Sequence, residues 1–144
     1  SCKNFNQDLS NWDVSNVTNM HAMFHSAENF NQDLSKWDVS SVTDMDSMFG
    51  YTIVFNQDLS TWDVSSVINM KYMFYNAESF NSNISSWDVS SVTDMYYMLA
   101  FTKVFNQDLS TWDVSNVTTN SSNFNNYANS EWVANTAYHP KFKR

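Results

Sequence analysis

The chain has 144 residues, enough for one domain, and a formal net charge of −8. This acidic balance argues against a sequence-independent grip on nucleic acid and against binding to anionic membranes, because both need a basic surface. The one glycine rules out a glycine-rich phosphate loop, and the one cysteine, Cys2, rules out an internal disulfide. No apolar run is long enough to cross a bilayer, and no signal peptide is visible within this numbering.

Five tandem repeats of 25 residues fill most of the chain. Their unit reads F-N-Q-D-L-S-x-W-D-V-S-x-V-T-x-M-x-x-M-F-x-x-A-x-x. Two aromatic rows set the register: Phe5, Phe30, Phe55, Phe80 and Phe105, and Trp12, Trp37, Trp62, Trp87 and Trp112. We therefore assign residues 1–129 to the repeats, which start near residues 5, 30, 55, 80 and 105. Residues 130–144 are assigned to a C-terminal cap and basic tail.

A second period of two repeats lies beneath the first. After the methionine pair, the first and third repeats read HSAEN and YNAES, whereas the second and fourth read GYTIV and AFTKV. The residue before the first methionine alternates in the same way, as Asn19, Asp44, Asn69 and Asp94. The array therefore resembles a duplicated 50-residue pair, in which adjacent coils differ on one face.

The spacing within one repeat predicts a strand followed by a helix. Trp37 and Val39 alternate with polar residues, which is typical of a strand over residues 34–39 with one buried face. The residues Val42, Met45, Met48, Phe49 and Thr52 recur at steps of three and four, which is typical of one helical face. Ser41 is the expected N-cap, and Asp44 completes a capping box.

A single repeat cannot bury its apolar residues, but stacked repeats can, because each coil covers the next. The predicted core consists of rows of tryptophan, valine, methionine and phenylalanine. We therefore predict an α/β solenoid of five strand–helix coils, with a short parallel sheet on the concave side of an arc.

The motif L-S-x-W-D-V-S-x-V is similar to the leucine-rich-repeat frame L-x-x-L-x-L-x-x-N. The fuller repeat resembles the BspA-like family of bacterial surface proteins and lipoproteins over residues 5–124. The resemblance implies a leucine-rich-repeat-like fold, export to the cell exterior and a place in adhesin-like proteins. It implies no catalytic residues. The fifth repeat departs from the pattern, with Asn120 and Asn123 at the methionine positions, so a complete fifth helix is not expected.

Repeated acidic residues are the first candidates for a metal site. They form one column on the expected strand side: Asp13, Asp38, Asp63, Asp88 and Asp113. Two interpretations stay open, calcium binding and hydrogen bonding of each carboxylate within its own turn; we favour the second, because calcium usually takes six or more oxygens around one point. His21 and His25 lie four residues apart, but two ligands alone favour a solvated face. We expect no cofactor.

Tyrosines mark the expected partner-binding surface on the outer face of the predicted helices: Tyr72, Tyr75, Tyr96 and Tyr97. Neighbouring exposed tyrosines are typical of recognition surfaces, although packing between adjacent helices is the alternative. A threonine row gives a further alternative, ice binding, but Ile68 interrupts it. Sequons at Asn16, Asn83, Asn116 and Asn120 matter only in a host that glycosylates secreted proteins.

The two ends suggest assembly. The first repeat begins at Phe5 without a cap, so either the array continues or a second subunit covers this end. At the other end, Trp132 is expected to close the stack from a short helix. The tail is basic and carries one aromatic residue, so we expect it to reach an acidic neighbour through Lys141, Phe142, Lys143 and Arg144. Cys2 is an incidental residue, a site for a lipid anchor or an intersubunit bridge, and we favour the first.

The residues contain no catalytic constellation, so we predict a non-enzymatic protein. The first hypothesis is an extracellular or cell-surface module for adhesion or protein–protein interaction. The alternative is a structural subunit that assembles head to tail into an extracellular filament or sheath. The partner is then another protein or a second copy of the chain.

Overall fold

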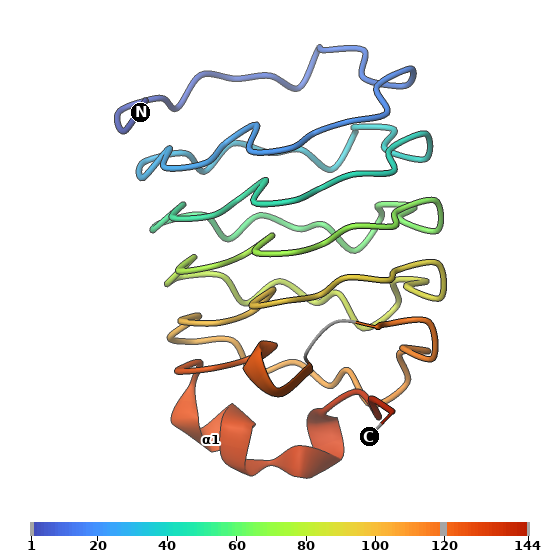
Figure 1. Ribbon diagram of the computed structural model, residues 1–144. Coiled ribbons are helices and arrows are strands. Elements are labelled where there is room, and N and C mark those ends of the chain that lie inside the picture. Colours follow the sequence, from blue (N-terminus) through green and yellow to red (C-terminus); the bar gives the residue numbers. More distant parts are fainter. Residues whose placement is uncertain (1, 119–120, 144) are drawn as a thin grey trace.

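The computed structural model describes residues 2–118 and 121–143. Successive repeats lie one above the other as a stack of coils, and the two termini lie at opposite ends of the stack (Figure 1). Coils 1 to 5 are numbered from their first residues, Phe5, Phe30, Phe55, Phe80 and Phe105.

The predicted α/β solenoid of the leucine-rich-repeat type is wrong. No sheet forms among the described residues, where strand-like pairing is limited to isolated parallel bridges that join Asn19, Asp44, Asn69 and Asp94 in turn. The helices of the same part of the chain are short and follow the fourth coil: η1 at Ser121–Asn123, α1 at Ser130–Ala134 and η2 at Thr136–Tyr138. The coils are instead built from consecutive tight turns.

The predicted helix over residues 42–52 is replaced by such turns. Backbone bonds there run to the third residue, as from Met48 N–H to the Met45 carbonyl at 3.2 Å. Ser47 and Tyr51 have φ of 57° and 59°, which a right-handed helix does not allow. Asp44 does not complete a capping box; its Oδ1 accepts from the backbone N–H of Asp46 at 2.9 Å. Turns and helices both place every third or fourth residue on one side, so the apolar spacing did not separate them.

The predicted strand over residues 34–39 is also a pair of turns. Trp37 N–H donates to the Leu34 carbonyl at 3.0 Å, and Val42 N–H donates to the Val39 carbonyl at 2.9 Å. The alternation of Trp37 and Val39 therefore marks two buried positions at turn ends and not a pleated strand.

Backbone hydrogen bonds between coils take over the role of a sheet. From coil 1 to coil 2 they join the N–H groups of Met20, Ala22, Phe24 and Ser26 to the carbonyls of Asp44, Asp46, Met48 and Gly50, at 2.8–2.9 Å. The same pattern joins coil 2 to coil 3 and coil 3 to coil 4. In these four positions the donors belong to the earlier coil and the acceptors to the later one. Beside them the direction is reversed, as from Thr43 N–H to the Thr18 carbonyl at 2.8 Å.

The core consists of the predicted rows of identical side chains. The phenylalanines at the start of each coil stack along the axis, with ring centroids 5.7–6.3 Å apart. Each tryptophan from coil 2 onward is buried and donates its Nε1–H to a carbonyl of the preceding coil, as Trp37 does to Leu9 at 3.0 Å. These bonds satisfy the polar atom of an otherwise apolar side chain.

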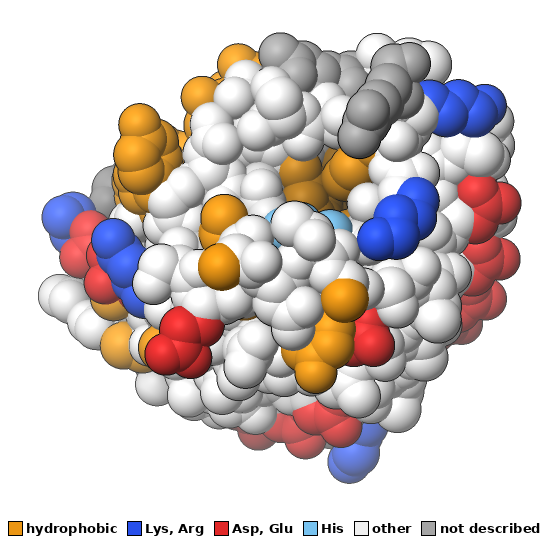
Figure 2. All heavy atoms as spheres, turned by 90° about the horizontal axis from the view of Figure 1, so that it is seen from below, with side chains coloured by type: hydrophobic (Ala, Val, Ile, Leu, Met, Phe, Trp, Pro, Cys, Tyr) orange, Lys and Arg blue, Asp and Glu red, His pale blue; other side chains and the backbone are white. Residues whose placement is uncertain are grey.

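Residues 130–143 lie across the C-terminal end of the stack (Figure 1). Asn129 caps α1 by accepting from the N–H of Glu131, and Trp132 of α1 is fully buried. The Trp132 ring meets Phe105 at 4.9 Å, and its Nε1–H donates to the Gln107 carbonyl at 2.8 Å. Viewed onto this end, apolar side chains form small separate groups among polar ones (Figure 2).

Candidate interaction face

Aromatic side chains gather along one edge of the stack, on the turns that follow the first methionine of each coil. We call this edge the tyrosine face and define it by Tyr51, Tyr72, Tyr75, Tyr96, Tyr97, Phe101 and Tyr127. The four tyrosines predicted as partner-binding belong to it and lie together. Tyr72 is the hub, with ring centroids 5.4 Å from Tyr75, 5.6 Å from Tyr96 and 5.7 Å from Tyr97.

A second chain of rings crosses all five coils and includes residues that the sequence analysis did not select. His25 meets Tyr51 at 5.4 Å, and Tyr51 meets Tyr75 at 5.3 Å. The chain continues from Tyr75 to Phe101 at 5.3 Å and from Phe101 to Tyr127 at 4.9 Å. The tyrosine face is therefore one continuous surface, and Tyr127 at its end is 74% exposed.

The 50-residue period has a packing reason on this face. One position of the turn carries His25, Gly50, Tyr75 and Ala100 in successive coils, and the next carries Ser26, Tyr51, Asn76 and Phe101. Large and small side chains thus alternate in both columns, in opposite phase. A ring from one coil leans over the small residue of the next: a Cβ added to Gly50 would lie 3.0 Å from Cδ2 of His25.

This alternation leaves a hollow on the tyrosine face. It has a volume of about 360 Å³ and is lined by His25, Ser47, Gly50, Tyr51, Tyr72 and Tyr75. Gly50 does not have a positive φ, so the backbone does not require a glycine there. The glycine instead provides space between the rings of coils 1 and 3.

Many of these aromatic residues occupy strained backbone positions. Positive φ is found at Tyr51, Tyr72, Tyr97, Phe101 and Tyr127, between 53° and 62°. The equivalent turn positions of other coils carry smaller residues, among them Ala22, Ser26 and Ser47. A non-glycine residue in the left-handed conformation costs about 1–2 kcal/mol. The conformation of these turns therefore does not require aromatic residues.

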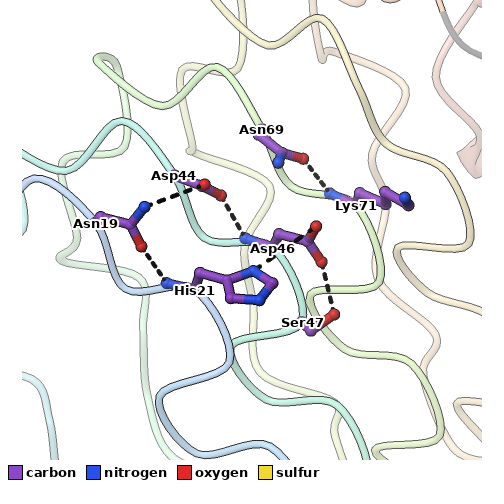
Figure 3. Close-up of polar contacts among 7 residues, drawn as sticks. All are labelled: Asn19, His21, Asp44, Asp46, Ser47, Asn69 and Lys71. Carbon is purple, nitrogen blue, oxygen red and sulfur yellow. Dashed lines mark hydrogen bonds and ion pairs between the residues drawn. The ribbon is translucent and has the colours of Figure 1, made fainter.

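A polar row borders the tyrosine face (Figure 3). In each of these turns, the Asn or Asp before the first methionine accepts a hydrogen bond from the backbone N–H two residues later. His21 N–H donates to Asn19 at 2.8 Å, and Lys71 N–H donates to Asn69 at 3.1 Å. Asn19 also donates its amide to Oδ2 of Asp44 at 3.4 Å. The Asn–Asp alternation thus keeps carboxylates of adjacent coils apart, because like charges directly opposite are destabilising.

Charged groups give this border a mixed potential. Asp46 accepts from the Ser47 hydroxyl at 2.6 Å, and its Oδ2 lies 3.8 Å from Nδ1 of His21. Lys71 Nζ lies 5.4 Å from the centre of the Tyr72 ring, a cation–π distance. Burial first, and then nearby groups that include Asp46 and Asp94, raise the pKa of Tyr72 above 10.0. Its hydroxyl therefore stays protonated and able to donate at neutral pH.

The aspartate column considered for calcium serves its own turns, as the favoured interpretation predicted. Ser15 donates to Asp13 Oδ1 from its hydroxyl at 2.6 Å and from its backbone at 3.1 Å, and Ser40 does the same to Asp38. The Ser40 hydroxyl first, and then its N–H, lower the pKa of Asp38 below 3.8. Across residues 2–118 and 121–143, no three His, Cys, Asp or Glu side chains meet in metal-binding geometry. Thus Asp13, Asp38, Asp63, Asp88 and Asp113 are not gathered into such a group, nor are His21 and His25.

The asparagine at the second position of each repeat also bonds between coils. Asn6 Oδ1 accepts from the backbone N–H of Asn31 at 2.9 Å, and Asn31 Oδ1 accepts from Asn56 at 2.9 Å. This column therefore satisfies backbone groups of the next coil.

The residues proposed for assembly lie at the two ends. Phe5 is partly buried and stacks on Phe30 at 5.7 Å, and Cys2 is exposed beside it. The tail folds back on its own chain: Phe142 packs on Phe124 at 5.2 Å, and Lys141 Nζ donates to the Thr136 carbonyl at 3.3 Å. Lys143 is close enough to lower the pKa of Asp113, after the bonds from Ser115. Arg144 and Asn120 lie outside the described residues.

The sequence analysis missed Tyr51, Phe101, Tyr127 and Gly50 as parts of the tyrosine face. The 50-residue alternation was the available signal, since it pairs Tyr51 with Phe101 and Gly50 with Ala100. It also missed Trp12, which is 55% exposed although its equivalents in later coils are buried. The available signal was the position of Trp12 in the first coil, which has no preceding coil in this sequence to cover the ring.

Comparison with known proteins identifies the family of the chain. Residues 1–78 and again residues 57–136 match a family described as "Mycoplasma protein of unknown function, DUF285". No curated protein and no solved structure matches the chain. None of the described helices has the length and apolar character needed to cross a membrane. Because the two matches together span residues 1–136, the chain belongs to the family described as Mycoplasma protein of unknown function, DUF285.

Proposed function

We propose that this protein is a non-enzymatic, extracellular interaction module of the BspA-like type, and that its tyrosine face binds a protein partner. The observation that carries the proposal is the backbone conformation under the rings. Tyr72 and Tyr97 are held at positive φ, where Ala22 and Ser47 serve in other coils, and Tyr51 is held so where Ser26 serves in coil 1. Strained conformations of this kind cluster at functional sites.

The composition of the face supports binding to protein. Tyrosines combine large contact area with a hydroxyl that hydrogen-bonds, and they dominate the energetics of many interfaces. Tyr72, Tyr75, Tyr96 and Tyr97 are half-buried, so each ring is already ordered by its neighbours while one edge remains accessible. Less conformational entropy is then lost on binding. The hollow at Gly50 offers a socket for one side chain of the partner.

The head-to-tail filament has less support than the side face. Such a filament needs an open C-terminal end, but residues 130–143 cover that end and bury Trp132. The basic tail packs on the same chain, so it is not held out toward a neighbour.

The test is a binding screen with a double variant. We would apply the protein to a panel of immobilised extracellular glycoproteins and their deglycosylated forms, then repeat each positive result with Tyr72→Ser combined with Tyr97→Ser. Ser47 occupies the equivalent position with φ of 57°, so the fold is expected to accept both changes. Loss of two central rings is expected to weaken binding by about tenfold or more.

Ile68→Thr provides the matched control, because Ile68 is exposed and the equivalent residues in coils 2 and 4 are threonines. We expect this variant to bind like the wild-type protein. Equal binding by the double variant and the wild type would contradict the proposal, provided that urea unfolding shows both to be folded.

A further inference from the structure

Coil 4 departs from the other coils in one short segment near its start. After the first phenylalanine, the other four coils read Asn-Gln-Asp-Leu, whereas residues 81–84 read Asn-Ser-Asn-Ile. Ser82 therefore stands where Gln32, Gln57 and Gln107 stand in coils 2, 3 and 5. Coil 4 lies between coils 3 and 5, so this departure is within the stack and not at either end (Figure 1).

The glutamine at this position donates its side-chain amide to the preceding coil. Gln57 Nε2 donates to Asn31 Oδ1 at 2.9 Å, and Gln107 Nε2 donates to Asn81 Oδ1 at 2.9 Å. Gln107 Nε2 also donates to the backbone carbonyl of Asn81 at 3.1 Å, and Gln32 makes the same two bonds in coil 2. One planar NH₂ group can thus bond both oxygens of the asparagine before it.

Ser82 does not make these bonds to Asn56. Its Oγ instead accepts from Leu59 N–H at 3.2 Å. Asn56 Oδ1 accepts from Asn81 N–H at 2.8 Å, and no group among the described residues donates to the Asn56 carbonyl. Both oxygens of Asn56 can therefore accept a further hydrogen bond, at the place where other coils provide an amide.

A polar hollow of about 370 Å³ lies at this place. Its lining consists of polar side chains from coils 3 and 4: Asn56, Asp58, Ser60, Asn81, Ser82 and Asn83. Hydrogen bonds from the Ser60 hydroxyl first, and then from its N–H, lower the pKa of Asp58 below 3.8, so this carboxylate is ionised at neutral pH. Asn83 replaces the aspartate of the other coils, so Asp58 is the one charged group among the described residues that line the hollow.

We propose that this hollow binds an arginine side chain of a partner protein. A guanidinium is planar, as the glutamine amide is, and one of its NH₂ groups can donate to both Asn56 oxygens as Gln107 does to Asn81. Its positive charge is matched by the single carboxylate, Asp58. Hydrogen bonds between charged partners are stronger than those between neutral ones, which favours arginine over a neutral amide.

Two other cations fit the lining less well. The lysine ammonium is a compact charge and not a planar group, so it does not reproduce the glutamine bonds. Calcium usually takes six or more oxygens, several of them from carboxylates, and this lining has one carboxylate. The hollow shares no lining residue with the tyrosine face, so the proposal is independent of the function proposed for that face.

The experiment titrates the full chain, at physiological salt, with the tripeptide Gly-Arg-Gly blocked at both ends. NMR follows the side-chain amide signals of Asn56 and Asn81, and we expect both to shift saturably. The matching lysine and glutamine tripeptides should bind several-fold more weakly. Asp58→Asn should weaken binding of the arginine tripeptide by about tenfold. Asn83 accepts from Ser85 N–H at 3.0 Å, so an asparagine is expected to keep this turn.

Two matched variants test the position of the site. Ser82→Gln restores the repeat and supplies the amide from the same chain, so it should abolish binding of the arginine tripeptide. Gln57→Ser makes the reverse change one coil earlier, where Asp33 is the equivalent of Asp58, and it should add a second set of shifts at Asn31.

The proposal would be overturned by unchanged binding in Ser82→Gln, or by the absence of new shifts at Asn31 in a folded Gln57→Ser variant. Equal affinity for the arginine and lysine tripeptides would also overturn it, because the general attraction of an acidic protein for cations would then explain the binding. The absence of a localised shift in the wild-type protein would do the same.

Discussion

The two ends of the stack differ in how their tryptophan is covered and hydrogen-bonded. At the C-terminal end, Trp132 is fully buried and its indole donates to the Gln107 carbonyl. At the N-terminal end, Trp12 is more than half exposed, and its indole has no acceptor among residues 2–118 and 121–143. The sequence around Trp132 is unrelated to the repeat, yet it covers Phe105 with an aromatic ring and donates an indole hydrogen bond to the last coil, at Gln107 and not at Leu109, the position used between coils. A coil therefore needs a covering segment with an aromatic ring and a hydrogen-bond donor, and that segment does not have to share the repeat sequence.

The comparison predicts its largest effect for the two tryptophans themselves. Trp132→Ala removes a fully buried ring that covers Phe105, so we expect a loss of about 3–5 kcal/mol in the free energy of unfolding. Trp12→Ala removes a ring that has no covering coil, and we expect about 1 kcal/mol or less. Urea unfolding followed by circular dichroism measures both. Similar losses for the two variants would mean that the ends do not differ as the structure indicates.

A smaller effect is expected from the indole hydrogen bond alone. Trp62→Phe keeps an aromatic ring in the core and removes only the indole bond to the Leu34 carbonyl, which still accepts from Trp37 N–H, so the change should cost about 0.5–1.5 kcal/mol. Trp12→Phe removes no such bond, so its free energy of unfolding should stay within about 0.5 kcal/mol of the wild type. Denaturant midpoints at constant slope give the comparison. A large loss in Trp12→Phe would show that the N-terminal indole already has a partner in solution.

A third variant relieves backbone strain in coil 1. Ala22 has φ of 54°, a conformation that glycine adopts without steric cost. Ala22→Gly should therefore stabilise the protein by about 0.5 kcal/mol, once the greater chain entropy of glycine is subtracted. Ala77→Gly is the control, since Ala77 is buried and has no positive φ, and it should destabilise by about 1 kcal/mol. Thermal unfolding of the pair tests the sign, and destabilisation by Ala22→Gly would contradict the argument.

The sequence predicted the stacking partners better than the local structure. The rows of phenylalanine and tryptophan followed from the 25-residue register, and they lie in the core. The residues of α1 and the burial of Trp132 were also predicted. The secondary structure was not, because consecutive turns place Met45, Met48 and Phe49 on one side just as a helix does. Glycine usually marks positive φ, but here Ser47 and Tyr51 adopt it.

The tyrosine face was predicted only in part, because its contacts between coils depend on the turns that the sequence analysis took for helices. Tyr96 and Tyr97 are adjacent in sequence, so their grouping was visible from the residues alone. The contact of Tyr75 with Tyr51 and Phe101 joins three coils, and it depends on the alternation of large and small residues between them. That contact depends on the stacking register of the turns. The predicted helix would have put these side chains in different relative positions.

The smallest effect at neutral pH is expected from the turns formed by Asp13 and Asp38. Variants there test whether the difference between the two ends of the stack extends to hydrogen bonds within a single turn. Hydrogen bonds from Ser40 lower the folded-state pKa of Asp38 below its unfolded value of 3.8. The ionised form is thus favoured in the folded protein, and this stabilisation is present above about pH 4 and lost as the pH falls through the folded-state pKa. Asn83 shows that an amide keeps the same turn, accepting from Ser85 N–H at 3.0 Å.

Asp38→Asn should therefore leave the free energy of unfolding at pH 7 nearly unchanged and reduce its loss below pH 4. Asp13→Asn should behave alike, because hydrogen bonds within its own turn lower the pKa of Asp13 in the same way. Urea unfolding from pH 7 to pH 2 would compare the two variants with the wild type. An equal response in coil 1 and coil 2 would mean that each turn is stable by itself, so that the ends differ only in what needs a neighbour. A larger acid response in coil 1 would instead show that the N-terminal end of the stack loosens even turns whose aspartate hydrogen bonds lie within one coil.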